Sequence, residues 1–307
     1  MKAMEAPCAV ALSCAGAAGP GGGERILVTG ATGFIGAHVV RVLLARGAKV
    51  TAVYRDEDRA RAQDWFGCVT PLRADVQAAT TAQLDEMAGH GRILHLAWGH
   101  LNNFKAEAHV TEVLPRHLEF LRQLVARGAK HLLVVGTCLE YGLQSGALTE
   151  DLPATPVTAY GLGKDILRRK LAPLCQGADA ALSWARLFYM HGPGQSEKSL
   201  LSQLDRAINS GASMFNMSGG RQLRDYLPVQ EVADILARLS LSGQGVGVVN
   251  CASGTPVSVL DLVQNHLRQR GADLRLNLGH YPYPDYEPME FWGDTTKLAA
   301  ALAASPD

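Results

Sequence analysis

Long apolar runs, an excess of charge of one sign and metal-ligand spacings are all missing from this sequence of 307 residues. No apolar run approaches the roughly 20 residues that a membrane-spanning helix needs, so we expect no membrane partner. The 29 basic and 29 acidic residues balance, which argues against nucleic acid as a partner. The chain is nevertheless 47% hydrophobic and can bury a substantial core.

Cysteine is scarce and scattered, with six residues and no C-x-x-C pair. This usage favours reduced thiols in the cytoplasm over a disulfide framework or a zinc site. The histidines at 95, 100, 109 and 117 lack H-E-x-x-H or similar spacing, so we expect no metal. Residues 1–23 are rich in Ala and Gly and are predicted to be a disordered leader. Their short apolar run disfavours the alternative, a signal peptide.

The stretch Ile26-Leu-Val-Thr-Gly-Ala-Thr-Gly-Phe-Ile-Gly36 predicts a buried strand that turns sharply into a helix. The first N–H groups of such a helix are unpaired, and together with the helix dipole they suit a pyrophosphate. The first glycine allows the turn, the second lets a phosphate approach the backbone, and the third lets the helix pack on the strand. We therefore predict a dinucleotide site, with an ordinary tight turn as the alternative. Its predicted contacts are Gly30, Thr32, Gly33, Phe34, Ile35 and Gly36.

The end of the second predicted strand, at residues 49–54, decides which dinucleotide binds. An NAD site usually places a carboxylate there to accept hydrogen bonds from the ribose hydroxyls. Tyr54 and Arg55 occupy this region instead, and a guanidinium pairs well with a 2′-phosphate. NADP(H) is therefore favoured as the cofactor, while NAD remains the alternative because Asp56 follows directly.

Strands and helices alternate regularly along the first half of the chain, which indicates a parallel, doubly wound sheet. Further strands are predicted at 69–72, 92–97 and 131–135, and a long helix at 105–127 that Pro115 is expected to kink. The strand ends add further candidate cofactor contacts, which are Asp75, Val76, Leu96 and Ala97. Asp75 would accept from the adenine amino group, or alternatively cap the next helix.

Tyr160 and Lys164 stand one turn apart at the start of a predicted helix and share one face. A free tyrosine has a pKa of about 10, and a neighbouring ammonium is expected to lower it towards the range useful for proton transfer. Thr137, at the end of the fifth strand, can bind the same substrate oxygen as Tyr160. We predict that Thr137, Tyr160 and Lys164 are catalytic; a surface Tyr and Lys is the alternative.

From about residue 25 onwards the chain resembles the extended short-chain dehydrogenase/reductase family, in its branch of nucleotide-sugar epimerases, dehydratases and reductases. The motifs that carry the resemblance are Thr29-Gly-Ala-Thr-Gly-Phe-Ile-Gly36, His95-Leu-Ala97, Gly136-Thr137-x-x-x-Tyr141-Gly142, Tyr160-x-x-x-Lys164, Arg186-Leu-Phe188, Gly192-Pro-Gly-Gln195 and Arg224-Asp-Tyr226. The resemblance implies a doubly wound parallel Rossmann sheet with a smaller C-terminal α/β substrate domain. It also implies a homodimer built through the helices at 105–127 and 158–175.

We expect the dinucleotide-binding domain over residues 24–190, with 226–252 returning to it, and the substrate-binding domain over 191–225 and 253–307. By the resemblance, Tyr160 is the catalytic acid/base, Lys164 binds the nicotinamide ribose and Thr137 orients the substrate oxygen. The expected substrate contacts are Thr137, Cys138, Tyr189, Phe215 and Arg224. Phe215 has core packing as its alternative, and Arg224 an ion pair with Asp225. The aromatic tail at 280–292 either walls the substrate pocket or packs as a strap.

Departures from the family patterns narrow the chemistry. Dehydratases of the family carry Asp and Glu just after the strand-end Thr, where this chain has Cys138 and Leu139. GDP-fucose-synthase-like enzymes place a Cys at the position of Leu139. The reactions that remain are hydride transfers at one carbon.

Tyr54 and Arg55, at the end of the second predicted strand, favour an NADPH-dependent reductase of the C4 ketone of a nucleotide-linked 4-keto-6-deoxy sugar. The alternative is a nucleotide-sugar 4-epimerase with tightly bound NAD. A non-catalytic NADP sensor is disfavoured by the Tyr–Lys pair, and a reductase of non-nucleotide carbonyls by Arg224.

Overall fold

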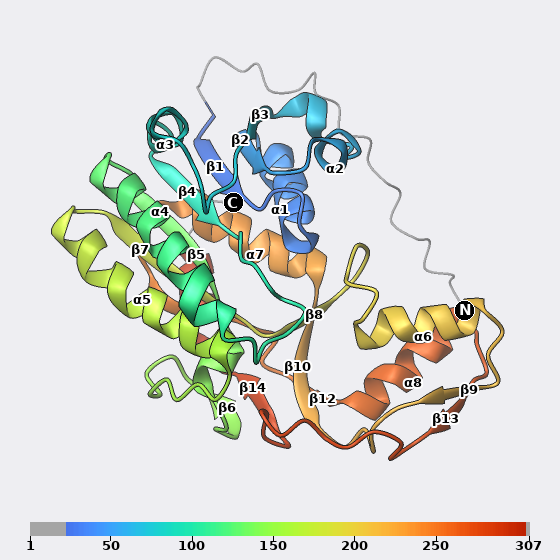
Figure 1. The fold of residues 1–307 in the computed structure, drawn as a ribbon. Coiled ribbons are helices and arrows are strands. Elements are labelled where there is room, and N and C mark those ends of the chain that lie inside the picture. The colour runs from blue at the N-terminus through green and yellow to red at the C-terminus, as the bar shows by residue number, and fades with distance from the viewer. Residues whose placement is uncertain (1–22, 305–307) are drawn as a thin grey trace.

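The computed structural model describes residues 23–304, and its centre is a parallel sheet of seven strands in the order β11-β7-β5-β4-β1-β2-β3 (Figure 1). The strands are β1 (Arg25–Thr29), β2 (Lys49–Tyr54), β3 (Thr70–Arg73), β4 (Arg92–His95), β5 (His131–Thr137), β7 (Ala181–Leu187) and β11 (Gly247–Cys251). The inner strands are apolar and almost entirely buried, because helices cover both faces. The strand order reverses beside β1, and such a reversal opens a ligand crevice at the carboxyl ends.

Helices pack on both faces of this sheet, so the predicted doubly wound α/β fold is confirmed. On one face lie α1 (Phe34–Ala45), α7 (Val229–Ser242) and α9 (Thr296–Ala303). On the other face lie α3 (Thr81–Ala88), α4 (Leu114–Ala126) and α5 (Ala159–Gly177). Ile26 and Val28 point into the first core and Leu27 into the second, as the period of a strand requires. The short elements α2 (Glu57–Arg61), η2 (Phe66–Cys68) and η4 (Cys138–Tyr141) lie in the connections.

A smaller part of the fold lies beside the carboxyl ends of the strands and comes from the C-terminal half (Figure 1). Its mixed sheet joins β8 (Tyr189–His191), β10 (Leu223–Pro228) and β12 (Pro256–Ser258). A second pair joins β9 (Met214–Asn216) and β13 (Arg275–Asn277), beside α6 (Leu200–Asn209) and α8 (Val259–Arg270). A third pair, β6 (Gly146–Leu148) with β14 (Phe291–Gly293), brings the aromatic tail back to the loop after β5.

The helix expected over 105–127 starts later and irregularly. A π-helical turn, η3 (His109–Val113), leads into α4, and Pro115 stands in the first turn of α4. The first residues of a helix have no intrahelical acceptor for their N–H groups, so a proline loses little there. Pro115 therefore stands at the junction of η3 and α4 and not in the interior of α4.

Two other expectations concern the N-terminus and the cysteines. Residues 1–22 of the expected leader lie outside the described residues. Cys68 is disulfide-bonded, so the expectation of reduced thiols is wrong at this position. Cys138, Cys175 and Cys251 are buried free thiols. Over residues 23–304, no helix has both the length and the apolar character of a membrane span, and no cluster of metal-ligating side chains occurs.

Close packing of the backbone requires glycine in the turn after β1. Gly30 has a φ of +70°, and a Cβ added to it would lie 2.9 Å from the backbone nitrogen of Ala97. A Cβ added to Gly36 would lie 2.1 Å from the carbonyl oxygen of Gly30. The turn thus closes tightly against the end of β4, and α1 packs directly on the turn.

Gly36→Ala is expected to lower the free energy of unfolding by about 1 to 3 kcal/mol, because the added methyl group meets rigid backbone. Urea denaturation of both proteins measures the difference. Gly177→Ala, at the end of α5, is the matched control, since a Cβ there meets nothing within 4 Å. A Gly36→Ala variant as stable as the wild type would contradict this packing.

Candidate active site

Helix α1 begins at Phe34 directly after the glycine turn, with Gly33 as its N-cap residue. No described side chain caps this end of the helix, and its first turn holds no acidic residue. The N–H groups of the first turn are therefore available to an anion, which the helix dipole also favours. The turn can bind a phosphate group with backbone atoms alone.

A crevice of about 300 Å³ opens above this turn at the carboxyl ends of the central strands. The predicted cofactor residues from the turn and strand ends all line it: Gly30, Thr32, Gly33, Phe34, Ile35, Gly36, Tyr54, Arg55, Asp75, Val76, Leu96 and Ala97. The structure adds residues that the sequence analysis did not assign to the crevice, including Arg59, Gln77, Trp98 and His117. Residues from the ends of four strands and from three helices thus meet in one place.

The polar groups at the end of β2 have definite roles. Arg55 is exposed at the crevice, whereas Arg59 donates to the carbonyl oxygen of Thr32 at 3.3 Å. Asp56 accepts from the backbone N–H of Arg59 and so caps α2. Tyr54 donates its hydroxyl proton to Glu57 at 2.9 Å. Among the described residues, the guanidinium of Arg55 therefore has no short contact with another side chain at this strand end.

Asp75 lies exposed in the crevice wall after β3. Its carboxylate accepts from the backbone N–H of Gln77 at 3.0 Å and so stabilises a turn. The following helix α3 is capped by Thr80, in a capping box with Gln83. The alternative role of Asp75 as a helix cap is therefore wrong.

Lys164 lies in the first turns of α5 and is 99% buried. Its Nζ donates to the carbonyl oxygen of Val135 at 2.7 Å and lies 4.1 Å from the ring centroid of Trp98. Its other two N–H groups have no acceptor among residues 23–304. Burial lowers the pKa of Lys164 to about 7, against the nearby charge of Glu140, which raises it.

Tyr160 is half-buried one turn earlier on the same helix, against the rings of Phe104 and His109. Burial raises the pKa of its phenol, the charge of Glu140 adds to this, and a hydrogen bond with Thr137 opposes it. The expectation that Lys164 lowers the pKa of Tyr160 is therefore wrong for this structure. The ammonium is directed to a backbone carbonyl and to Trp98, and the phenol is protonated at neutral pH.

Thr137 and Cys138 complete this side of the site. Thr137 is the N-cap of the turn η4, where its hydroxyl accepts from the backbone N–H of Leu139 at 3.3 Å. Cys138 is 95% buried, and burial with the neighbouring Glu287 charge raises the pKa of its thiol. The thiol is therefore uncharged at neutral pH and is a poor base.

A second cavity, of about 320 Å³, lies between β8, β9, β10 and the C-terminal tail. Tyr189, Phe215 and Arg224, three of the expected substrate contacts, line it. The aromatic tail contributes Tyr281 and Tyr286 to its wall, and it is thus both a strap and a pocket wall. Phe215 also packs in the local core, which was its alternative role, and its contact with a substrate stays a prediction.

Arg224 is 97% buried and is held by a carboxylate that the sequence analysis did not assign. Its Nη2 lies 3.0 Å from Glu287 of the tail, to which Tyr189 also donates its hydroxyl proton. Asp225 instead accepts from the backbone N–H groups of Ser253 and Gly254. The alternative ion pair of Arg224 with Asp225 is therefore wrong.

Comparison with known protein families identifies the family of this chain. Residues 26–252 match the model described as the NAD dependent epimerase/dehydratase family, which is well over half of the chain. The chain belongs to this family. It is therefore an NAD(P)-dependent enzyme of the extended short-chain dehydrogenase/reductase type, and its cofactor is a nicotinamide dinucleotide.

Individual relatives are distant but cover nearly the whole chain. A dTDP-6-deoxy-L-talose 4-dehydrogenase (NAD(+)) from Aggregatibacter actinomycetemcomitans is 26% identical and covers 88% of this chain and 99% of the relative. A UDP-glucose 4-epimerase from Azospirillum brasilense is also 26% identical, covering 78% of this chain and 76% of the relative. The solved structure of MoeE5 in complex with UDP-glucuronic acid and NAD has a TM-score of 0.73 at 26% identity, covering 92% of this chain and 94% of that one.

The glycine turn fits the family cofactor on its own geometry. A Cβ at Gly33 would lie 3.1 Å from the carbonyl oxygen of Gly30, so this residue too is kept small at the uncapped helix end. The turn and α1 would hold the pyrophosphate, and the strand ends would hold the adenosine. The open N–H groups of Lys164 suit ribose hydroxyls, which accept as well as donate.

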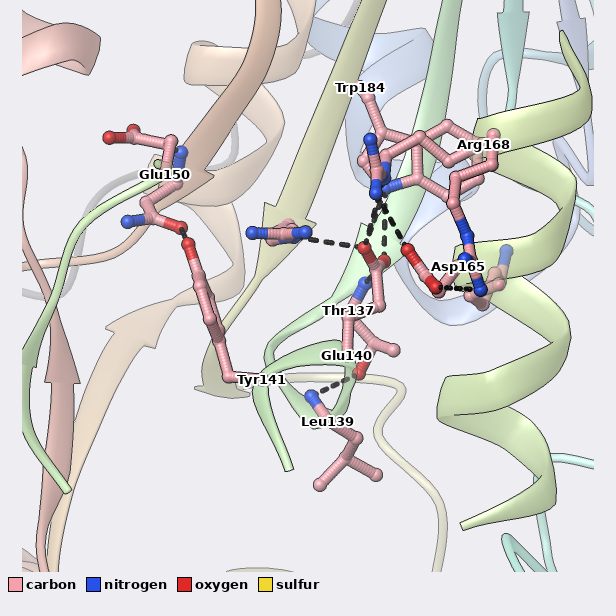
Figure 2. Close-up of polar contacts among 12 residues, drawn as sticks. Thr137, Leu139, Glu140, Tyr141, Glu150, Asp165, Arg168 and Trp184 are labelled. Carbon is pink, nitrogen blue, oxygen red and sulfur yellow. Dashed lines mark hydrogen bonds and ion pairs between the residues drawn. The ribbon is translucent and has the colours of Figure 1, made fainter. Parts of the chain in front are cut away.

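Glu140 is a further residue that the sequence analysis missed. It is completely buried, and its carboxylate accepts from the backbone N–H of Thr137, from Nε1 of Trp184 and from Nε of Arg186, each at 2.9 Å (Figure 2). Gly136 leaves room for this contact, since a Cβ there would lie 2.4 Å from the carboxylate. The Thr137-x-x-Glu140 spacing is that of a capping box and could have revealed part of it.

Burial of Lys164 predicts an unusual dependence of stability on pH. The pKa is about 7 in the folded protein and about 10.4 in an unfolded chain, so the unfolded state binds more protons between these values. The free energy of unfolding contributed by this site therefore rises with pH across that window. Lys164→Met is expected to remove a rise on the order of a few kcal/mol, as measured by urea denaturation at pH 7, 8 and 9.

Lys170→Met is the matched control, because Lys170 is exposed on the same helix. This variant is expected to keep the wild-type slope against pH. A Lys164→Met variant with that same slope would show that burial does not depress the pKa of Lys164.

Proposed function

We propose that this enzyme is an NADPH-dependent reductase of the C4 ketone of a nucleotide-linked 4-keto-6-deoxy sugar. The observation that carries the proposal is the half-buried phenol of Tyr160, which is protonated at neutral pH and lies beside Thr137. Cys138 is an uncharged buried thiol and Leu139 is apolar. This set can protonate one oxygen but is poorly suited to removing a carbon-bound proton.

The relatives agree with chemistry at one carbon of a nucleotide sugar. The Aggregatibacter relative is named as a 4-dehydrogenase of a dTDP-6-deoxy sugar, and reduction of a 4-ketone is the reverse of such an oxidation. MoeE5 binds a UDP sugar together with NAD. Nucleotide-linked sugars are therefore the substrate class that we assign to the cavity around Arg224.

In this mechanism Tyr160 donates its phenolic proton to the C4 oxygen, and Thr137 hydrogen-bonds the same oxygen and orients it. Lys164, with two N–H groups open, binds the nicotinamide ribose and passes a proton back towards Tyr160. The bound cofactor supplies the hydride for C4. Tyr160 is reprotonated from solvent after each turnover.

Arg224 would bind the substrate diphosphate, and Tyr189 and Phe215 would line the rest of the cavity. A buried guanidinium needs a carboxylate or a phosphate as its partner, and Glu287 takes that place here. A phosphate that reaches Arg224 therefore has to replace Glu287. The aromatic tail that carries Glu287 would move with it.

NADPH is our preferred cofactor because Arg55 lies at the crevice and its guanidinium has no short side-chain contact among the described residues, whereas Asp56 caps a helix.

The second candidate function is a 4-epimerase with tightly bound NAD. It is favoured by the epimerase among the relatives and by the NAD in the names of the family and of the Aggregatibacter enzyme. We also propose a homodimer that pairs through α4 and α5.

Tyr160→Phe tests the catalytic proposal, because it removes the proton donor and keeps the ring packing. We expect the turnover number to fall by about 10²- to 10⁴-fold, while the Kd for NADPH stays within twofold. NADPH oxidation with dTDP-, UDP-, GDP- and CDP-linked 4-keto sugars measures the first, and fluorescence titration the second. Retained turnover in the variant would refute the assignment.

Arg55→Ala tests the cofactor preference. Loss of a charge-assisted contact to the 2′-phosphate should raise the Kd for NADPH by about tenfold or more and leave the Kd for NADH unchanged. Arg61→Ala is the matched control, since Arg61 pairs with Glu57 and does not line the crevice. Two results would favour the epimerase alternative. One is equal affinity of the wild type for NADPH and NADH, and the other is an equal loss of affinity for both cofactors in Arg55→Ala.

A further inference from the structure

Trp98 stands three residues after the end of β4 and has no role in the function described so far. It is half-buried and lines the crevice above the glycine turn. Its ring lies 4.9 Å from that of His117 and 6.2 Å from that of Tyr160. The side chain thus lies between the cofactor crevice and the two functional residues of α5.

The ammonium of Lys164 lies over the face of this indole. The distance from Nζ to the ring centroid is 4.1 Å, well inside the range in which a cation is attracted to the ring quadrupole. Trp has the strongest such attraction among the aromatic side chains, and burial of Lys164 strengthens it. The contact stabilises the charged form of Lys164, which burial alone disfavours.

Trp98 is itself held in one orientation. Its Nε1–H donates to Nδ1 of His109 at 3.0 Å, and Nε2 of His109 lies 3.0 Å from the carbonyl oxygen of Asn103. An indole N–H only donates and a carbonyl oxygen only accepts, so His109 carries its proton on Nε2. A protonated imidazole could not accept from Trp98, and burial keeps His109 neutral by lowering its pKa.

The same loop also contacts Tyr160. The backbone N–H of Tyr160 donates to the carbonyl oxygen of Phe104 at 3.0 Å, and the two rings stack with centroids 5.3 Å apart. The ring of His109 lies 5.1 Å from that of Tyr160. One segment, from Trp98 to His109, therefore supports both the phenol and the ammonium.

Few charges act on Lys164 from the elements around it. Glu140 of η4 raises its pKa, and Tyr160 on its own helix is an uncharged phenol. His95 of β4, His109 of η3 and His117 of α4 are all kept neutral by burial, and the nearby ammonium lowers their pKa further. Glu140, the carbonyl oxygen of Val135 and the face of Trp98 are thus the groups described here that favour the ammonium.

We propose that Trp98 is a positioning residue that holds the Lys164 side chain against its indole face and keeps it charged until the nicotinamide ribose binds. The inference rests on the proposed function only in giving Lys164 the ribose as its ligand. Its first test uses the cofactor-free protein, so that a failure of the reductase assignment would not affect the result.

The pKa of Lys164 in Trp98→Leu is the deciding quantity. NMR of the lysine Nζ and Cε signals over pH 5 to 10 measures it, with the Lys164 signal assigned by its loss in Lys164→Met. We expect a pKa about one unit below that of the wild type, and a smaller decrease in Trp98→Phe, which keeps a weaker aromatic face. The Phe variant also serves if the Leu variant fails to fold.

Binding of oxidised NADP or NAD supplies the second readout. A pKa that falls from about 7 to about 6 reduces the charged fraction of Lys164 about fivefold at pH 7 and less than twofold at pH 5.5. The affinity of Trp98→Leu for the cofactor should therefore fall about fivefold at pH 7 and recover at pH 5.5. A merely structural loss would weaken binding equally at both values.

Trp65→Leu is the matched control. Trp65 is a completely buried tryptophan in the core on the other face of the sheet, so its loss damages packing without touching Lys164. This variant should lose stability and keep the wild-type pKa of Lys164. An unchanged pKa in both Trp98 variants, or an equal decrease in Trp65→Leu, would overturn the proposal.

Discussion

The arrangement of this active site depends on one buried carboxylate. Glu140 accepts hydrogen bonds from the strand-end Thr137, and from Trp184 and Arg186 of the neighbouring strand, and Arg168 of α5 approaches it at 3.9 Å (Figure 2). It therefore ties β5, β7 and α5 together at the candidate active site. A buried arginine without a carboxylate partner strongly destabilises a fold. The ion pair of Glu140 with Arg186 therefore fixes how β5 and β7 are joined here.

Burial has the largest effect on the pKa values of Lys164 and Tyr160, and the charge of Glu140 acts on both beside it. Glu140 raises the pKa of Lys164 against burial, which favours an ammonium at neutral pH. It also raises the pKa of Tyr160, which favours a phenol. A proton donor and a ribose-binding cation are the states that a carbonyl reductase needs at the start of its cycle, and one carboxylate favours both.

The sequence predicts what local spacing determines, and it fails where contacts are long-range. The glycine turn, the uncapped start of α1 and the strand ends follow from short patterns, and the structure brings their residues into one crevice. Spacing of i and i+4 put Lys164 near Tyr160 but could not show that Val135 and Trp98 hold the ammonium. Glu287 was missed because 63 residues separate it from Arg224, and no local pattern links them.

The central claim is that the site transfers one hydride to C4 of the sugar while Tyr160 protonates the oxygen. Incubation of the enzyme with a 4-keto-6-deoxy nucleotide sugar and NADPH carrying deuterium at both hydrogens of nicotinamide C4 tests it most directly, with NMR and mass spectrometry of the product. The account predicts one deuterium per product molecule, located at C4, and one NADPH oxidised for each. No deuterium in the sugar and no net loss of NADPH would contradict it, and inversion at C4 of the corresponding 4-hydroxy nucleotide sugar by the same enzyme would indicate an epimerase.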